Sequence, residues 1–311
     1  MKLSVIIPIY NAERFLDKIL DAVADQSVDA SFEVILIDDG STDSTAAICD
    51  RRAAADSRFR VIHTDNRGPS AARNRGLDAA LGDYVVFVDC DDAVHPLYLA
   101  RLLQAVEESG AEMAVCRFTR EKGGLKATDT PPKVVSGPRL LEMMLYQRGA
   151  DSSPYCKIYR RRLFNDTRFR EGIIFEDLEM HSRLYLKVKT AALIPDRLYL
   201  YSPSAYSLLT VYSPARFDAM LVTADIVERL KDVSPTLAKA AADRRLSAAF
   251  NAFLLASRHN ATDRAARAWA EIKALRRQSL FNPKVRLKNK IGIALSYLGK
   301  RPIRLLDRLL H

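Results

Sequence analysis

Short apolar runs alternate with amphipathic stretches over roughly the first third of the chain, and this alternation limits the fold more than any other feature. Runs rich in Val, Ile and Leu predict strands buried on both faces at residues 3–9, 33–37, 60–63 and 84–88. Apolar residues at helical spacing predict helices between them, at 11–23, from 41–43 to 51 or beyond, and at 70–81. This order is typical of an α/β fold with a mostly parallel sheet flanked by helices.

The pattern is mixed in the middle of the chain and helical at its end. Helices are expected at 97–109, 139–146 and 176–186, strands at 112–118 and 157–159, and a loop or flap from 121 to 138. From residue 214 onward, alanine, leucine and arginine predict helices almost throughout. We therefore expect an α/β domain over residues 1–213 and a helical C-terminal region over residues 214–311.

The composition is that of an ordinary globular protein with a basic tail. Of the 311 residues, 48% are hydrophobic and 28% are charged, and the net charge is +10. Residues 284–311 hold eight basic residues against Asp307, so the tail carries seven of the ten net charges and indicates an acidic partner. Four scattered cysteines without zinc-type spacing indicate reduced thiols. The apolar N-terminal run is short and interrupted by Pro8, which favours a strand over a signal peptide.

Polar residues follow three of the four predicted N-terminal strands. Tyr10 and Asn11 follow the first strand, Asp39 follows the second, and Asp89 and Asp91 follow the fourth. Ligands bind outside the carboxyl ends of parallel strands, so these groups are expected at one site. Crowded carboxylates repel one another, and a bound cation would relieve that repulsion. Two carboxylates at i and i+2 suit Mg²⁺ or Mn²⁺, although a solvated acidic turn would give the same pattern.

Four segments in this part of the chain match a known family in order and spacing. They are SVIIPIYNAE (residues 4–13), VILIDDGSTD (34–43), NRGPSAARNRG (66–76) and GDYVVFVDCDD (82–92). The chain resembles family 2 glycosyltransferases of the GT-A fold, the inverting enzymes that build bacterial surface polysaccharides. The resemblance implies transfer of a hexose or N-acetylhexosamine from a nucleotide-sugar, with a UDP-sugar favoured, to an acceptor hydroxyl.

The resemblance also implies roles for individual residues. Tyr10 would stack on the base, and Asp39 would accept a hydrogen bond from the base N–H, which favours uracil. Asp89 would contact the ribose or the metal, and Asp91 would bind Mn²⁺ or Mg²⁺, which neutralises the diphosphate. The residues expected to contact the donor are Pro8, Tyr10, Asn11, Glu13, Asp39, Gly68, Ala72, Asn74, Asp89 and Cys90.

Inversion requires a base that takes the proton of the acceptor hydroxyl. Glu176 and Asp177 resemble the family's Glu-Asp motif, which assigns the base to Asp177; acidic residues that merely begin a helix would give the same pattern. His181 is interpreted as a packed histidine outside the site.

One feature of the family is missing from the sequence. Relatives carry a basic residue after the last strand, whereas residues 199–204 contain none, although residues 207–210 partly fit the segment that follows. A positive contact to the diphosphate is either absent or supplied by Lys157, Arg160 or Arg161.

Two interpretations of the tail remain open. Leu287, Ile291, Leu295 and Leu298 lie near one face of a predicted helix flanked by lysines, and the residues after Pro302 repeat the pattern. A basic amphipathic helix suits the surface of an anionic membrane, where a lipid-linked or polysaccharide acceptor would also fit. Alternatively, the apolar face packs on the protein's own body. No apolar run is long enough to span a bilayer, so we expect a cytoplasmic protein, or one held peripherally at the inner face of the cytoplasmic membrane.

Other functions compete with glycosyl transfer. A nucleotide-sugar-binding protein without turnover would keep the same motifs. A sugar nucleotidyltransferase would carry a glycine-rich basic loop where Pro8 to Asn11 stand. Nucleic-acid binding is not expected, because the basic residues of the tail lack interleaved stacking aromatics.

Overall fold

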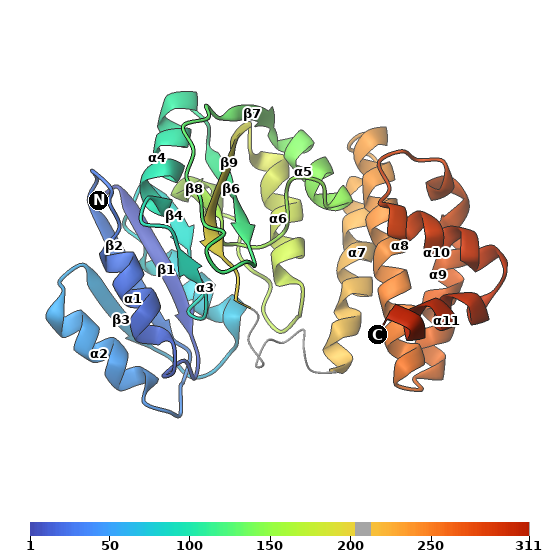
Figure 1. Ribbon diagram of the computed structural model, residues 1–311, viewed down its shortest axis with the longest axis horizontal. Helices are drawn as coiled ribbons and strands as arrows, with labels where there is room; N and C mark the ends of the chain where they lie inside the picture. The colour runs from blue at the N-terminus through green and yellow to red at the C-terminus, as the bar shows by residue number, and fades with distance from the viewer. Residues whose placement is uncertain (203–212, 311) are drawn as a thin grey trace. The chain divides into compact units, whose positions relative to one another are not determined.

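The computed structural model describes residues 1–202 and 213–310, with side chains through residue 307 (Figure 1). The chain divides into two compact units. One consists of Met1–Leu140 and Ser152–Thr210, and the other of Leu141–Asp151 and Val211–His311. The partly matching segment at 207–210 lies outside the described residues.

The first unit is built on a nine-stranded sheet with the order β3-β2-β1-β4-β8-β6-β9-β5, and β7 also pairs with β9. The strands β1 to β4 pair in parallel with one another, and β6 is parallel to β9, whereas β5, β7 and β8 pair antiparallel. The strands are β1 (Leu3–Ile9), β2 (Phe32–Asp38), β3 (Phe59–His63), β4 (Tyr84–Phe87), β5 (Ala93–Val94), β6 (Met113–Thr119), β7 (Lys133–Ser136), β8 (Lys157–Arg160) and β9 (Thr190–Leu200). The predicted α/β fold, with a mostly parallel sheet flanked by helices, is confirmed; the antiparallel strands β5, β7 and β8 make the sheet mixed.

Helices cover both faces of this sheet. Side chains alternate along a strand, so β1 sends Val5 and Ile7 into a core shared with Ile19 and Leu102, while Ile6 points to the opposite face. On that face a helix approaches closely, because a Cβ on Gly76 would lie 2.3 Å from Cγ2 of Ile6. The helices of the unit are α1 (Leu16–Ala24), α2 (Thr45–Ala55), α3 (Pro69–Ala79), α4 (Tyr98–Ser109), α6 (Glu176–Lys187) and the 3-10 helix η1 (Arg161–Phe164).

The sequence did not predict the strands β5 and β9, and two further elements differ from the expectation. The first helix begins at Leu16 instead of Asn11, because Asn11 has a left-handed φ of 47° and its side chain accepts a hydrogen bond from the backbone N–H of Thr42. The predicted loop at 121–138 contains β7, whose residues are exposed or half-buried. Without a buried face, β7 has no apolar alternation that the sequence could reveal.

The parallel strands bring their carboxyl ends to one edge. In register, Leu3 of β1 aligns with both Phe32 of β2 and Tyr84 of β4. The loops that follow these three strands therefore emerge at the same edge of the sheet.

The second unit is helical, as expected for the C-terminal region. Its helices are α7 (Asp218–Leu230), α8 (Pro235–Arg258), α9 (Thr262–Leu280), α10 (Leu287–Tyr297), α11 (Lys300–Leu310) and the 3-10 helix η2 (Pro214–Phe217), joined by the end of α5 (Gly137–Tyr146). Ser234 caps α8 by accepting the N–H of Leu237, with Pro235 in the first turn. Among the described residues, no helix combines the length and apolar character needed to cross a bilayer.

Buried polar contacts explain why residues 141–151 belong to the helical unit. Asn282 Nδ2 donates to Tyr146 Oη at 2.8 Å and to Asp243 Oδ2 at 2.5 Å, and Tyr146 Oη lies 3.2 Å from the same carboxylate oxygen. Lys284 also pairs with Glu142. These side chains are far apart in sequence, so the sequence pattern did not indicate the association.

Candidate active site

A pocket of about 880 Å³ opens at the carboxyl edge of β1, β2 and β4, within the size range of small-ligand sites. Two further segments, at 153–155 and 174–177, also line it. All of the expected site residues except Asn74 line this pocket. They are Pro8, Tyr10, Asn11, Glu13, Asp39, Gly68, Ala72, Asp89, Cys90, Asp91 and Asp177.

The loop after β1 is held by the loop after β2. Asn11 donates its backbone N–H to Ser41 Oγ at 3.0 Å, and the carboxylate of Glu13 accepts the N–H of Ser44 at 3.1 Å. These bonds leave the ring of Tyr10 half exposed at the pocket. An exposed aromatic face at a pocket can stack on a planar base.

Asp39 organises the loop that starts α3. Its two carboxylate oxygens accept the backbone N–H groups of Arg67 at 3.0 Å and Gly68 at 2.7 Å. Gly68 has a φ of 88°, a left-handed conformation that favours glycine, and it precedes Pro69 at the first turn of the helix. Asp39 is thus buried as a structural acceptor, and a carboxylate oxygen has a second lone pair with which it can accept a further donor.

Arg73 links two acidic segments that lie far apart in the sequence. Its guanidinium donates to Asp89 Oδ1 at 3.1 Å and to Glu176 Oε1 at 2.9 Å, and its side chain is buried. Such a fork geometry suits two carboxylates at once. Arg73 lies inside a matched motif, but no role was predicted for it, because only the fold brings Glu176 to it.

Asp177 lies at the start of α6, where the chain turns through Phe175 with a left-handed φ of 72°. Its carboxylate accepts Ser152 Oγ at 2.8 Å and the N–H of Leu178 at 2.6 Å. Burial, helped by the neighbouring charge of Glu176, raises the pKa of Asp177 to about 6, against the lowering effect of these hydrogen bonds and of Arg73. A carboxylate with this pKa is ionised at neutral pH and basic enough to accept a proton.

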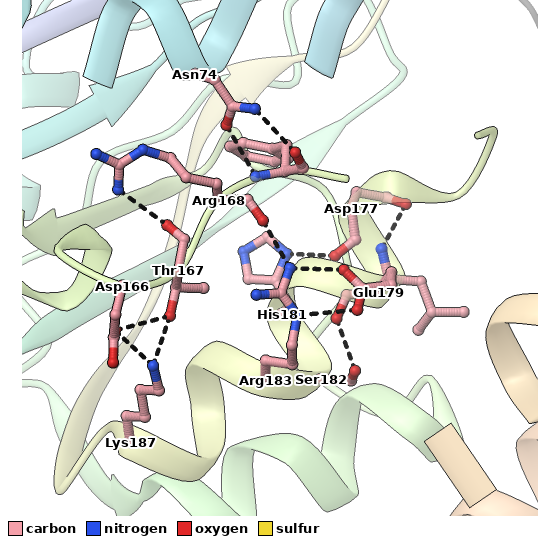
Figure 2. A network of polar contacts seen from close by, with 12 residues as sticks. Asn74, Asp166, Thr167, Arg168, Asp177, Glu179, His181, Ser182, Arg183 and Lys187 are labelled. Carbon is pink, nitrogen blue, oxygen red and sulfur yellow. Dashed lines mark hydrogen bonds and ion pairs between the residues drawn. The ribbon is translucent and has the colours of Figure 1, made fainter. Parts of the chain in front are cut away.

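Figure 2 shows polar contacts of α6 near Asp177. His181 is fully buried, and its Nδ1 lies 2.8 Å from the backbone oxygen of Asp177 (Figure 2). Its Nε2 lies 2.8 Å from Tyr159 Oη of β8. His181 therefore joins α6 to β8 through Tyr159, and it does not line the pocket. This agrees with its interpretation as a packed histidine.

Asn74, which is predicted to contact the donor, is not among the residues that line the pocket. Its amide donates to the backbone oxygen of Phe169 at 2.8 Å and accepts the N–H of Phe169 at 2.9 Å. The same segment is tied to α6, because Arg183 donates to the oxygen of Arg168 and Lys187 donates to Asp166 (Figure 2). Asn74 thus uses its amide to connect α3 to the chain that leads to Asp177.

The basic residues suggested for the diphosphate do not line the pocket. Arg160 lies over the ring of Tyr84 and Arg161 donates to the oxygen of Gly82, both at the opposite, amino end of β4. Lys157 is fully buried and donates to the oxygen of Ser153 at 2.6 Å, so it stabilises the segment at 153–155 instead.

The pocket also contains residues for which no role was predicted. Its described cationic lining residues are Arg14, which is exposed, and Arg73. Tyr155 and Tyr201 form an aromatic wall, and Tyr155 stacks on Tyr199 with ring centroids 4.5 Å apart. Tyr199 Oη in turn accepts the N–H of Asp89. Arg14, Tyr155 and Tyr201 come from turns and loops without a repeating pattern, so only the tertiary structure identifies them.

The acidic residues of the site suit a hard divalent cation. Within residues 1–202 and 213–310, no group of three or more His, Cys, Asp or Glu side chains is arranged to hold a metal. Asp89 and Asp91 nevertheless both line the pocket and offer oxygen ligands. Mg²⁺ and Mn²⁺ commonly take one or two carboxylates from the protein and complete their shell with substrate phosphates, so this pair fits such an ion.

Residues 4–168 match the sequence model of the family described as glycosyl transferase family 2. This match covers more than half of the chain, including the loops after β1, β2 and β4. The chain belongs to glycosyl transferase family 2. The family and the GT-A fold implied by the four motifs are therefore confirmed, and the protein is a glycosyltransferase.

Individual members of the family are similar over most of this glycosyltransferase. Glycosyltransferase GlyG of Streptococcus pneumoniae is 31% identical over 267 residues, which cover 76% of this chain and 88% of that protein. The poly(ribitol-phosphate) beta-N-acetylglucosaminyltransferase TarS of Staphylococcus aureus is 29% identical over 247 residues, or 75% of this chain. The aligned part spans only 42% of TarS.

Solved structures share the fold of this glycosyltransferase. Residues 1-349 of S. aureus TarS in complex with UDP-GlcNAc superpose with a TM-score of 0.72 and 23% identity, covering 96% of this chain and 91% of that one. The mannosyltransferase PcManGT of Pyrobaculum calidifontis, in complex with GDP-Man and Mn²⁺, has a TM-score of 0.55 and 18% identity, covering 98% and 82%.

Proposed function

We propose that this glycosyltransferase moves a sugar, with inversion, from a UDP-sugar to a hydroxyl of a lipid-linked or polysaccharide acceptor. The observation that carries the proposal is that Asp39, Asp91 and Asp177 line one pocket, although they come from three separate segments. The UDP-GlcNAc complex of TarS supports a uridine nucleotide as the donor. We further propose that residues 1–213 bind the donor and perform catalysis, whereas residues 214–311, which form one helical unit with residues 141–151, do not.

The nucleotide of the donor would bind at the loops after β1 and β2. The exposed ring of Tyr10 would stack on uracil, and Asp39 would accept the N–H of the base. Arg14 is the exposed cation of the pocket lining, and we propose that it contacts the diphosphate in place of the missing basic residue near Tyr201.

Asp91 and Asp89 would hold Mn²⁺ or Mg²⁺. The ion, when bound, supplies positive charge that offsets the charge of the leaving diphosphate. Arg73 keeps Asp89 in place from the protein side and connects it to the segment of Asp177 through Glu176.

Asp177 would accept the proton of the acceptor hydroxyl as that oxygen attacks the anomeric carbon. The support for this role is the pocket position of the carboxylate and its raised pKa of about 6. The hydrogen bond from Ser152 orients the carboxylate, so the free lone pairs of Asp177 can face the acceptor.

The test is a donor-hydrolysis and transfer screen with UDP-, GDP- and dTDP-sugars in the presence of Mn²⁺ or Mg²⁺. We expect turnover of a UDP-sugar that chelation abolishes and added metal restores, with Asp91→Ala losing the metal dependence together with most of the activity. Asp177→Asn should keep UDP binding and lower transfer by about 10²–10⁴-fold.

The same screen separates the competing functions. UDP-sugar binding without turnover at any metal concentration would indicate a binding protein. Release of pyrophosphate from UTP and a sugar phosphate would indicate a nucleotidyltransferase. Either result would overturn the proposal.

A further inference from the structure

Helix α10 carries its apolar stripe on the outside. Leu287, Ile291 and Leu298 recur at helical spacing, and their exposed fractions are 73%, 44% and 75%. Phe281, just before this helix, is 86% exposed. A soluble protein rarely leaves so many neighbouring apolar side chains in water, so this surface indicates a partner.

The buried side of α10 is partly polar, which is the reverse of an ordinary surface helix. Its buried residues are Asn289, Ile293 and Ser296. Asn289 Nδ2 donates to Ser247 Oγ, and the backbone oxygen of Ser296 accepts Arg276 Nη1 at 2.6 Å. Hydrogen bonds with α8 and α9 thus fix the orientation of α10, and they hold the apolar stripe outward.

Basic residues flank the stripe along the chain, with no acidic residue among them. Between residues 281 and 306 the chain contains no Asp or Glu. The basic residues of this stretch that are exposed or half-buried are Lys284, Arg286, Lys288, Lys290, Lys300, Arg301 and Arg304. Lys284 is partly neutralised by Glu142.

We infer that the outward stripe of α10, with Phe281 and the flanking basic residues, is a docking surface for an anionic lipid bilayer. Apolar side chains insert at the boundary between head groups and acyl chains, while lysine and arginine bind the head-group phosphates. The inference specifies the surface behind a peripheral membrane location and is independent of the donor site.

Charge decides between this partner and two others. A second copy of the chain, related by two-fold symmetry, would bring the same basic residues against each other, and like charges at close range oppose association. A nucleic acid would bind the basic residues but would give the exposed Leu287, Ile291 and Leu298 no apolar contact. Of these three partners, the anionic bilayer is the one that matches both the apolar and the basic part of the surface.

The helix α11 does not extend the stripe in the predicted way. Ile303 is buried, and Arg304 lies over the ring of Phe253 at 5.4 Å from its centroid. The apolar face of α11 thus packs on the helical unit through Ile303, while Leu305 stays 60% exposed. The two interpretations of the tail therefore apply to different helices.

The test uses the full chain and sedimentation with vesicles of equal parts phosphatidylglycerol and phosphatidylcholine, compared with pure phosphatidylcholine. We expect binding to the anionic vesicles only. The combined variant Leu287→Ser, Ile291→Ser and Leu298→Ser should weaken that binding at least about tenfold, because each serine removes an apolar insertion. The control is the pair Leu81→Ser and Val233→Ser, which changes apolar residues elsewhere that are 65% and 50% exposed, and this variant should bind like the parent.

Two further measurements distinguish lost docking from lost folding or lost catalysis. Donor hydrolysis in solution and the circular dichroism spectrum of the triple variant should equal those of the parent. Unchanged vesicle binding by the triple variant, or no binding by the parent, would overturn the inference. A dimer of the parent that the triple variant converts to a monomer, or DNA binding that it weakens, would assign the surface to the other partners.

Discussion

At the scale of single residues, the site depends on how each carboxylate is compensated. Asp39 is bound by two backbone N–H groups, Asp89 and Glu176 share Arg73, and Asp177 accepts Ser152. These contacts offset part of the repulsion between the acidic groups, so several of them can lie close together. Burial raises the pKa of Asp177 to about 6, which suits it to act as a base.

The pH dependence of transfer should follow the ionisation of Asp177. The base acts only when deprotonated, so kcat/KM should be constant near neutral pH and fall about tenfold per unit below the pKa of about 6. In Ser152→Ala the hydrogen bond that stabilises the carboxylate is absent, so the pKa rises and the acid limb moves to higher pH. A pH–rate profile checks this, with Ser109→Ala in α4 as a control. An acid limb at the same pH in both variants would contradict the assignment.

Arg73 should behave as a positioning residue. Arg73→Gln removes the charge that lowers the pKa of Asp177, so the acid limb of the pH–rate profile should shift to higher pH. Loss of one partner of a buried ion pair should also cost about 3–5 kcal/mol of stability. Arg73→Lys keeps the charge but lacks the forked guanidinium that reaches both Asp89 and Glu176. It should therefore raise the KM for the donor and leave the acid limb of the pH–rate profile almost unchanged. Arg75→Lys, on the exposed side of the same helix, is the control. Equal profiles for Arg73→Gln and the parent would rule out this role.

At the scale of elements, two contacts position the site. Asp39 accepts the backbone N–H of Gly68, the residue that precedes α3. Helix α6 is tied to α3 through the segment at 166–171. The closeness of α3 to the sheet therefore sets the distance between the donor loops and Asp177. That closeness depends on Gly76.

Gly76→Ala should push α3 away from the sheet. The new Cβ would lie 2.3 Å from Ile6, and overpacking of this kind costs about 1–3 kcal/mol. Thermal and denaturant unfolding measure the loss. The double variant with Ile6→Ala removes the clashing atoms, so its destabilisation should be smaller than the sum of the two single changes. Additive losses would show that the contact is not responsible.

At the scale of the whole molecule, charge is concentrated in one part of the chain. The tail at 284–311 holds seven of the ten net positive charges, whereas the charged side chains of the donor pocket are mostly acidic. Binding through the tail and catalysis in the pocket should therefore respond differently to salt.

Raising the salt concentration from about 0.05 M to about 0.5 M should release the protein from anionic vesicles, because screening weakens attraction between the basic tail and the lipid head groups. Donor hydrolysis in solution should change far less, because its charges lie in a partly buried pocket. Sedimentation and hydrolysis assays on one preparation measure both effects. Vesicle binding that is insensitive to salt would leave the basic residues without a role in docking.

The α/β fold, the family and many of the residues that line the pocket follow from the amino-acid sequence alone. Parallel strands carry continuous apolar runs, and their carboxyl ends share an edge, so the strand pattern is enough to place Tyr10, Asp39, Asp89 and Asp91 together. The motif at 176–177 pointed to Asp177 only through the family resemblance. Local pattern also predicted most helices and strands, because their buried faces repeat at regular spacing.

The side chains that meet across long sequence separations are set by the folded chain and not by any local pattern. The fold joins Arg73 to Glu176, places Asn74 on the backbone of Phe169 instead of in the pocket, and turns Arg160 and Arg161 to the far end of β4. It also determines which face of α10 is exposed. Periodicity shows that a helix has an apolar face, but the hydrogen bonds and packing of its neighbours decide where that face points.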